Sequence, residues 1–226
     1  MKPNRKLAEA AAPNGGVISL SEHDGSYCIR LNGRSLMHSS AAASELLLGE
    51  LAAAGLAGRA HPLVLMGGLG LGFSLKGMLG KLGPRAAVQV AELIPEVLVW
   101  NRTFLSGLNG KLLDDPRVEV LIEDVRDVLA RAGRDRYDAI VLDIDNGPAA
   151  MVQKANARLY DHAGIRTMMA ALKPGGRAAI WSETPDHGFA ARLSEAGLLV
   201  ETIPAKRYPE AKRDTLAIYV ADKPGG

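Results

Sequence analysis

Leu63-Val-Leu-Met-Gly67-Gly68-Leu-Gly70-Leu-Gly72 is the stretch of sequence that decides the fold. An apolar run enters a loop with four glycines in six positions, and Glu92 ends the next apolar run twenty residues later. Glycines after a strand let the backbone approach a ligand, and an acid at the tip of the following strand can accept both ribose hydroxyls. The pattern predicts a nucleoside site formed by Gly67, Gly68, Gly70, Gly72 and Glu92.

The spacing of these glycines argues against a dinucleotide. The fingerprint G-x-G-x-x-G/A needs a small sixth residue so that a pyrophosphate can reach the helix N-terminus. That position is Phe73 when counted from Gly68 and Leu75 when counted from Gly70. A P-loop is excluded too, because no Gly-Lys-Ser/Thr closes the loop. The loop therefore favours a ligand without a diphosphate, such as an adenosyl sulfonium.

Length, charge and cysteine content set further bounds. The chain has 226 residues and a net charge of +2, which fits one large α/β domain and is too mild to predict a nucleic-acid partner. Its single cysteine, Cys28, cannot form an intrachain disulfide, so we expect a reducing, cytoplasmic location. No run approaches the roughly 20 apolar residues of a membrane span. Histidines are scattered, and no metal site is expected.

Three regions follow one another along the chain. Residues 1–16 are rich in Ala, Pro, Asn and Gly and are expected to be a flexible tail. Residues 17–60 combine a small β-meander with a helix over Ala41–Leu56. Residues 61–226 are expected to form a Rossmann-like ligand-binding domain.

Strands and helices alternate through this third region. The predicted strands are Leu63–Met66, Ala87–Glu92, Val118–Ile122, Ala139–Asp143, Arg177–Trp181, Leu199–Pro204 and Thr215–Ala221. The predicted helices are Leu71–Leu82, Pro95–Leu105, Val125–Ala132, Asp161–Leu172 and Pro185–Ala196. Nearly continuous apolar strands indicate burial on both faces, hence a parallel sheet between helices. We predict a doubly wound α/β fold with a seven-stranded, mostly parallel sheet and a reversed last strand.

In this arrangement the sequence resembles the spermidine synthase-like branch of the class I AdoMet-dependent transferases, where AdoMet is S-adenosylmethionine. The resemblance spans about Val17–Ala221. The stretches that carry it are Gly67–Gly72, Ala91–Val97, Leu113–Asp124 and Tyr137–Pro148.

The resemblance implies a role for each acid at a strand end. Glu92 would bind the ribose hydroxyls and Asp124 the adenine amino group, while Asp143 would be the catalytic carboxylate. All three follow strands whose carboxyl ends bind ligands in open α/β sheets. Asp124 is also placed to cap the helix that begins at Val125, and capping does not exclude adenine binding.

Asp143 and Asp145 are the candidate catalytic pair. In an extended chain their carboxylates point to the same side, and with Asn146 and Glu183 they would line an acidic pocket for a cationic acceptor. Asp-Asn-Gly-Pro is also an ordinary turn sequence, so turn formation is the competing interpretation. Trp181 could shape this pocket or pack in the core, as could Tyr160.

The departures from the family pattern concern substrate anchors. Spermidine synthases resemble G-G-G-D-G-G in the first loop, where the Asp holds the ammonium of decarboxylated AdoMet, and here that position is Gly70. Their Tyr-His-Glu segment is replaced by Ala43-Ser44-Glu45. An amine cation buried without its carboxylate is strongly penalised.

These observations imply a transferase that moves an aminopropyl or other alkyl group from decarboxylated AdoMet or AdoMet to a small, amine-bearing acceptor. The alternatives are an AdoMet-dependent small-molecule methyltransferase and a non-catalytic nucleoside-binding regulator. A nucleic-acid methyltransferase is disfavoured, because no base-flipping motif follows the fourth strand of the nucleotide domain. The resemblance also suggests a homodimer, with the β-meander at its interface.

Overall fold

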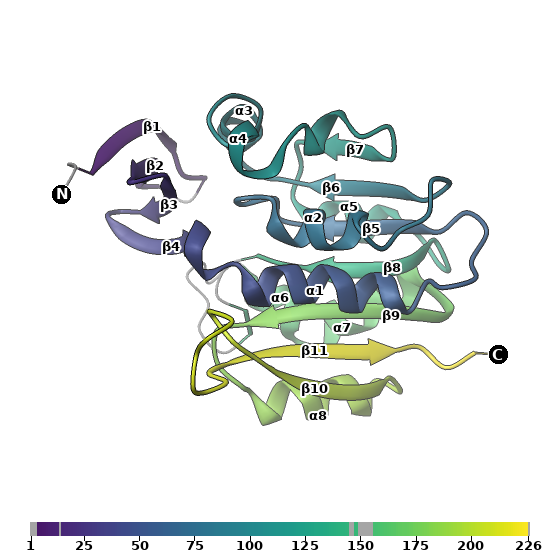
Figure 1. The fold of residues 1–226 in the computed structure, drawn as a ribbon. Helices are drawn as coiled ribbons and strands as arrows, with labels where there is room; N and C mark the ends of the chain where they lie inside the picture. Colours follow the sequence, from purple (N-terminus) through teal and green to yellow (C-terminus); the bar gives the residue numbers. More distant parts are fainter. Residues whose placement is uncertain (1–3, 14, 145–146, 149–155, 226) are drawn as a thin grey trace.

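The computed structural model describes residues 4–13, 15–144, 147–148 and 156–225 (Figure 1). It contains a large mixed sheet flanked by helices on both faces and a small antiparallel sheet at one end. The carboxyl ends of the parallel strands point toward the small sheet, which places the predicted site between the two sheets.

The large sheet has seven strands in the order β10-β11-β9-β8-β5-β6-β7. Their bounds are β5 Leu63–Gly67, β6 Ala87–Ala91, β7 Val118–Leu121, β8 Tyr137–Leu142, β9 Leu172–Ser182, β10 Leu199–Ala205 and β11 Leu216–Asp222. Strands β7, β6, β5, β8 and β9 pair in parallel, and β11 pairs antiparallel with both β9 and β10. The predicted doubly wound sheet with a reversed last strand is confirmed.

Helices bury both faces of this sheet. The α-helices are α1 Ala43–Ala54, α2 Phe73–Leu79, α3 Pro95–Thr103, α4 Ser106–Asn109, α5 Val125–Arg131, α6 Ala157–Tyr160, α7 His162–Ala171 and α8 His187–Glu195, with 3-10 turns η1 Ser39–Ala41 and η2 Leu112–Asp114. Val64 and Met66 join the core under α1, α2 and α3, whereas Leu65 joins the core under α5, α7 and α8. Successive strand residues therefore serve opposite cores, which explains why the strand sequences are almost wholly apolar.

The small sheet has four antiparallel strands, β1 Arg5–Ala11, β2 Val17–His23, β3 Ser26–Leu31 and β4 Arg34–His38. The expectation of a flexible tail over residues 1–16 is corrected for Arg5–Ala11, because β1 pairs with β2 there. A turn closed by the Ala12 amide on the Gly16 carbonyl, at 3.0 Å, joins them. Backbone pairing within this sheet orders a segment whose alanine-rich composition carries little side-chain signal.

Within the described ranges, no helix is both long enough and apolar enough to cross a bilayer. The helix predicted over Ala41–Leu56 is α1, two residues shorter at each end. The strand predicted over Arg177–Trp181 begins five residues earlier, at Leu172.

Candidate active site

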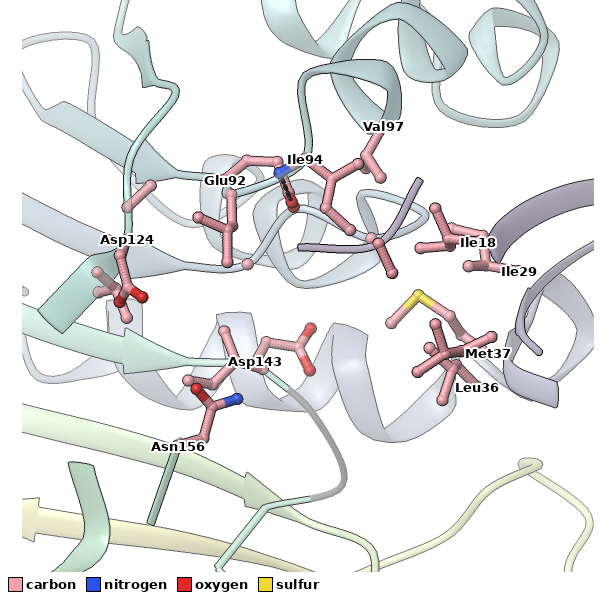
Figure 2. A pocket seen from close by; sticks show the side chains of 18 of the residues that line it. Ile18, Ile29, Leu36, Met37, Glu92, Ile94, Val97, Asp124, Asp143 and Asn156 are labelled. Carbon is pink, nitrogen blue, oxygen red and sulfur yellow. Dashed lines mark hydrogen bonds between the residues drawn. The ribbon is translucent and has the colours of Figure 1, made fainter. Parts of the chain in front are cut away.

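A cavity of about 150 Å³ lies at the carboxyl ends of the central strands. Acids and loop glycines of the large sheet form one side of its wall: Gly68, Gly70, Glu92, Glu123, Asp124 and Asp143. Apolar side chains of the small sheet form the opposite side: Ile18, Ile29, Leu31, Leu36 and Met37. Figure 2 shows the Met37 thioether reaching into this cavity from the side of the small sheet. The cavity thus has a polar half that can bind hydroxyls and an apolar half that excludes water.

Gly68 and Gly70 bring the backbone against the cavity. Both adopt positive φ, +89° and +51°, a conformation that side-chain-bearing residues rarely adopt. A Cβ on Gly68 would lie 2.3 Å from the Asp143 carbonyl oxygen, so only glycine allows β5 and β8 to approach here. Gly67 ends β5 and Gly72 precedes α2, and neither belongs to the cavity wall.

Glu92 is 8% exposed and held by the backbone. Its Oε2 accepts the Leu69 amide at 3.0 Å and its Oε1 accepts the Ile94 amide at 2.9 Å. Burial raises the pKa of this carboxyl, and the backbone hydrogen bonds from Ile94 and Leu69 oppose the shift. Glu92 therefore stands at a fixed place between the glycine loop and the start of α3, at the edge of the cavity (Figure 2).

Asp124 caps a helix and also belongs to the cavity wall. Its side chain caps α5 by accepting the Arg126 amide at 2.8 Å, and it also lines the cavity. The Arg126 guanidinium donates to the same carboxylate, with Nη2 2.6 Å from Oδ2. Burial opposes ionisation of Asp124, but these hydrogen bonds outweigh it and lower the pKa of the carboxyl. Asp124 is thus a fixed anion at the far end of the cavity from Met37 (Figure 2).

Asp143 follows β8 and faces the cavity. The Ser74 hydroxyl donates to its Oδ2 at 2.5 Å, which orients the carboxylate from α2. Burial raises the pKa of Asp143 to about 6, although the Ser74 hydrogen bond lowers it. This combination gives a carboxyl group that can exchange a proton near neutral pH.

A second, smaller cavity of about 30 Å³ also has Asp143 in its wall. Glu45, in the first turn of α1, lies there, and its Oε2 accepts the Ser44 hydroxyl at 2.7 Å. Ser44 in turn accepts the Trp181 indole N–H at 3.0 Å. Burial and then the charge of Asp143 raise the pKa of Glu45 to about 7. Two carboxyl groups with raised pKa values therefore face the same small space.

The two cavities adjoin. Leu36, Met37 and Asp143 line both of them. A molecule in the larger cavity and a molecule in the smaller one would meet beside the Asp143 carboxylate. The smaller cavity continues outward to Glu183, which the sequence predicted to line an acidic pocket, and to Arg207.

The other predicted site residues have separate outcomes. Asp145 and Asn146 are outside the described residues. Trp181 lines the small cavity, whereas Tyr160 packs in the core against Phe189, with ring centroids 5.6 Å apart. In the described part of the chain, no three His, Cys, Asp or Glu side chains are grouped to hold a metal ion.

Sequence reasoning missed several residues of the wall. It treated Glu45 only as part of an altered family segment, although an acid in the first turn of a helix next to the glycine loop is a usable signal. Met37 and Arg207 reach the site from the small sheet and from the connection between β10 and β11, and neither has a local pattern that marks it as a site residue.

Comparison with known proteins places this site in a family. Residues 70–186, just over half of the chain, match the model of the spermine/spermidine synthase domain. A polyamine aminopropyltransferase of Corynebacterium efficiens is 34% identical over 152 residues, which is 63% of this chain and 28% of that protein. A polyamine aminopropyltransferase 2 of Pseudomonas aeruginosa is 34% identical over 121 residues, which is 52% of this chain and 32% of that protein. The chain spans only about a quarter to a third of the length of these curated relatives.

The fold is shared more widely than the sequence. The spermidine synthase of Thermotoga maritima superposes with a TM-score of 0.74 at 19% identity, covering 97% of this chain and 73% of that one. A spermidine synthase in complex with the transition-state analogue AdoDATO superposes with a TM-score of 0.73 at 19% identity, covering 97% and 72%. The glycine loop, the three strand-end acids and these matches lead to one conclusion: the chain belongs to the spermine/spermidine synthase domain family.

Proposed function

We propose that this protein transfers an aminopropyl group from decarboxylated AdoMet to a small amine acceptor. The observation that carries the proposal is the position of Asp143, whose carboxylate stands in the walls of two adjoining cavities. The larger cavity would hold the donor and the smaller one the acceptor nitrogen. Family membership supports aminopropyl transfer over other alkyl transfers.

The polar half of the larger cavity fits an adenosine. The Glu92 carboxylate accepts backbone amides, among them those of Leu69 and Ile94, and we assign its remaining acceptor capacity to the ribose hydroxyls. We assign to Asp124, which also accepts from Arg126, a hydrogen bond from the adenine amino group. The glycine loop supplies close backbone approach, and no phosphate-binding group is required there.

Sulfonium chemistry needs alignment more than acid–base strength. The donor supplies a carbon made electrophilic by the neighbouring positive sulfur. The acceptor nitrogen bonds to this carbon as the carbon–sulfur bond breaks, and the bonding pair stays on sulfur. Asp143 and Glu45 hold the amine by its N–H groups and take the proton that the new ammonium loses, which their raised pKa values near 6 and 7 allow. The apolar wall from Ile18 and Ile29 keeps water away.

A second candidate, methyl transfer from AdoMet, is favoured by one specific contact. Position 70 lacks the carboxylate that would hold the ammonium of decarboxylated AdoMet, and the Met37 thioether covers Gly70 instead. The ammonium of decarboxylated AdoMet would lack a partner there, whereas the ammonium of AdoMet is balanced by the carboxylate that AdoMet itself carries.

Product analysis separates the two candidates. The protein is incubated with either donor and a panel of mono- and diamines, and the nucleoside product is identified by mass spectrometry. Methylthioadenosine formed from decarboxylated AdoMet, together with an aminopropylated amine, supports the proposal. S-adenosylhomocysteine formed from AdoMet with a methylated amine supports the second candidate and contradicts the first.

The proposal also covers the cellular compartment and the oligomeric state of the protein. The free, buried Cys28 is compatible with the reducing cytoplasm. A homodimer through the small sheet remains a proposal, which sedimentation analysis of the purified chain tests. Retention of DNA or RNA on the protein at physiological salt would contradict a purely small-molecule role.

A further inference from the structure

An ion pair closes the outer end of the small cavity. Glu183 follows β9, and Arg207 lies in the connection from β10 to β11. Arg207 Nη2 lies 3.3 Å from Glu183 Oε1, and their side chains are 42% and 31% exposed. Both residues belong to the cavity wall, so the only arginine that the described part of that wall contains neutralises Glu183.

The inner end of the same cavity is different. Glu45 and Asp143 lie there with hydrogen bonds from Ser44 and Ser74. Neither forms a salt bridge among the described residues, although the charge of Arg207 lowers the pKa of Glu45 against the effect of burial. Among the described residues, the remaining titratable side chain of the wall is His38, whose Nδ1 lies 2.7 Å from Ser40 Oγ. A cation entering the cavity therefore meets two carboxyl groups inside and an already neutralised carboxylate outside.

The size of the cavity agrees with this division. Its volume of about 30 Å³ exceeds the roughly 10–15 Å³ that one water molecule requires, so the cavity admits a small group and no more. A single amine nitrogen with its first carbon can enter after a small adjustment of side chains. A chain with a second ammonium would have to carry that charge outward, to the place where Arg207 pairs with Glu183.

We propose that Arg207 is a specificity-determining residue that favours an acceptor amine with one cationic nitrogen over a diamine. Its guanidinium pairs with the Glu183 carboxylate. The distal ammonium of a diamine would need this same carboxylate as its partner. This inference rests on the proposed function, because it assumes that the small cavity receives the acceptor. It adds the substrate class: a monoamine, or an amine whose far end is neutral.

The selectivity that the Arg207–Glu183 ion pair provides is moderate. A half-exposed ion pair contributes little stability, so a diamine can displace Arg207 at a small cost. Removing the guanidinium should therefore raise the affinity ratio of diamine to monoamine about fivefold. The monoamine is the reference, because the effect of the Arg207 charge on Glu45 acts on the inner nitrogen of both amines alike and cancels in the affinity ratio.

Calorimetric titration of the full chain tests this inference without requiring turnover. Butylamine and 1,4-diaminobutane are titrated, with methylthioadenosine present, into the wild type, Arg207→Gln, the double variant Glu183→Gln/Arg207→Gln, and Lys206→Gln. Lys206 is the exposed neighbour of Arg207, so its variant removes the same charge from the same loop. We expect the diamine to monoamine ratio to rise in Arg207→Gln and to return to the wild-type value in the double variant.

Other results would contradict either the role of Arg207 or the assignment of the small cavity to the acceptor. A ratio that changes no more in Arg207→Gln than in Lys206→Gln overturns the role of Arg207 while leaving the amine site in place. A wild type that already prefers the diamine by tenfold overturns it as well. If no amine binds to any of the four proteins, the assignment of the cavity to an acceptor fails, and the proposed function fails with it.

Discussion

Met37 and Gly70 are in direct contact across the site: a Cβ placed on Gly70 would lie 2.5 Å from the Met37 sulfur. The small sheet therefore fills, with an uncharged thioether, the space that a side chain at position 70 would occupy. This contact predicts how the donor loop responds to substitution.

Gly70→Asp alone should destabilise the protein, because the new side chain collides with Met37 at a backbone φ of +51°. Overpacking of this kind costs about 1–3 kcal/mol of unfolding free energy. The double variant Met37→Ala/Gly70→Asp should recover most of that stability and should shift donor preference toward decarboxylated AdoMet about tenfold. Thermal unfolding and competition between the two donors measure both effects, with Met37→Ala as the control. An unchanged donor preference in a folded double variant would show that position 70 does not face the donor's amine.

Asp143→Asn should separate an enzyme from a nucleoside-binding regulator. The amide cannot take a proton, so we expect the transfer rate to fall about 100-fold or more while donor affinity changes little. Asp127→Asn, on the exposed side of α5, is the matched control. Single-turnover rates and calorimetry with methylthioadenosine provide the two readouts. Equal rates in wild type and Asp143→Asn would remove Asp143 from the chemistry, and a wild type that forms no product with any amine would favour the regulator.

Glu92→Gln should weaken nucleoside binding. The substitution places an NH₂ group against one of the two amides that Glu92 accepts, from Leu69 and Ile94. An unsatisfied buried donor costs about 1–3 kcal/mol, so methylthioadenosine affinity should fall roughly 10- to 100-fold. Glu96→Gln, exposed at the start of α3, should leave that affinity unchanged. Equal affinities in both variants would mean that Glu92 only supports the loop.

The carboxyl pair should make stability depend on pH. Burial raises the pKa of Glu45 from 4.5 to about 7, so the folded protein binds more protons than the unfolded chain in that interval. The unfolding free energy of the wild type should therefore fall as pH rises from about 5 to 8. Glu45→Gln removes this loss and should gain about 1–3 kcal/mol relative to wild type over the same interval.

Denaturant unfolding at pH 5 and pH 8 measures this difference. Glu50→Gln, on the exposed side of α1, is the control and should keep the wild-type slope. A Glu45→Gln variant whose pH dependence matches wild type would show that Glu45 ionises normally in the folded state.

The sequence was sufficient to predict the large sheet, because each strand is an apolar run bounded by turn residues and each helix follows at the expected interval. It was equally informative for Glu92, Asp124 and Asp143, which lie at strand ends that topology brings to one edge. Positions determined by local pattern were thus predictable.

The rest depends on contacts between distant segments. Strand β1 forms through backbone pairing with β2, which its alanine-rich sequence does not reveal. Glu45 reaches Asp143 only because α1 packs over the sheet beside α2, and Arg207 reaches Glu183 only through the pairing of β10 and β11. The periodicity of the sequence does not predict these contacts between distant segments.

The most direct test of the central claim is calorimetry of the wild-type chain with decarboxylated AdoMet, AdoMet and methylthioadenosine side by side. We predict that all three bind at one site and that decarboxylated AdoMet binds at least as tightly as AdoMet. A preference for AdoMet of about tenfold, or roughly 1.4 kcal/mol, would contradict aminopropyl transfer. Failure of methylthioadenosine to bind would contradict the adenosine site itself.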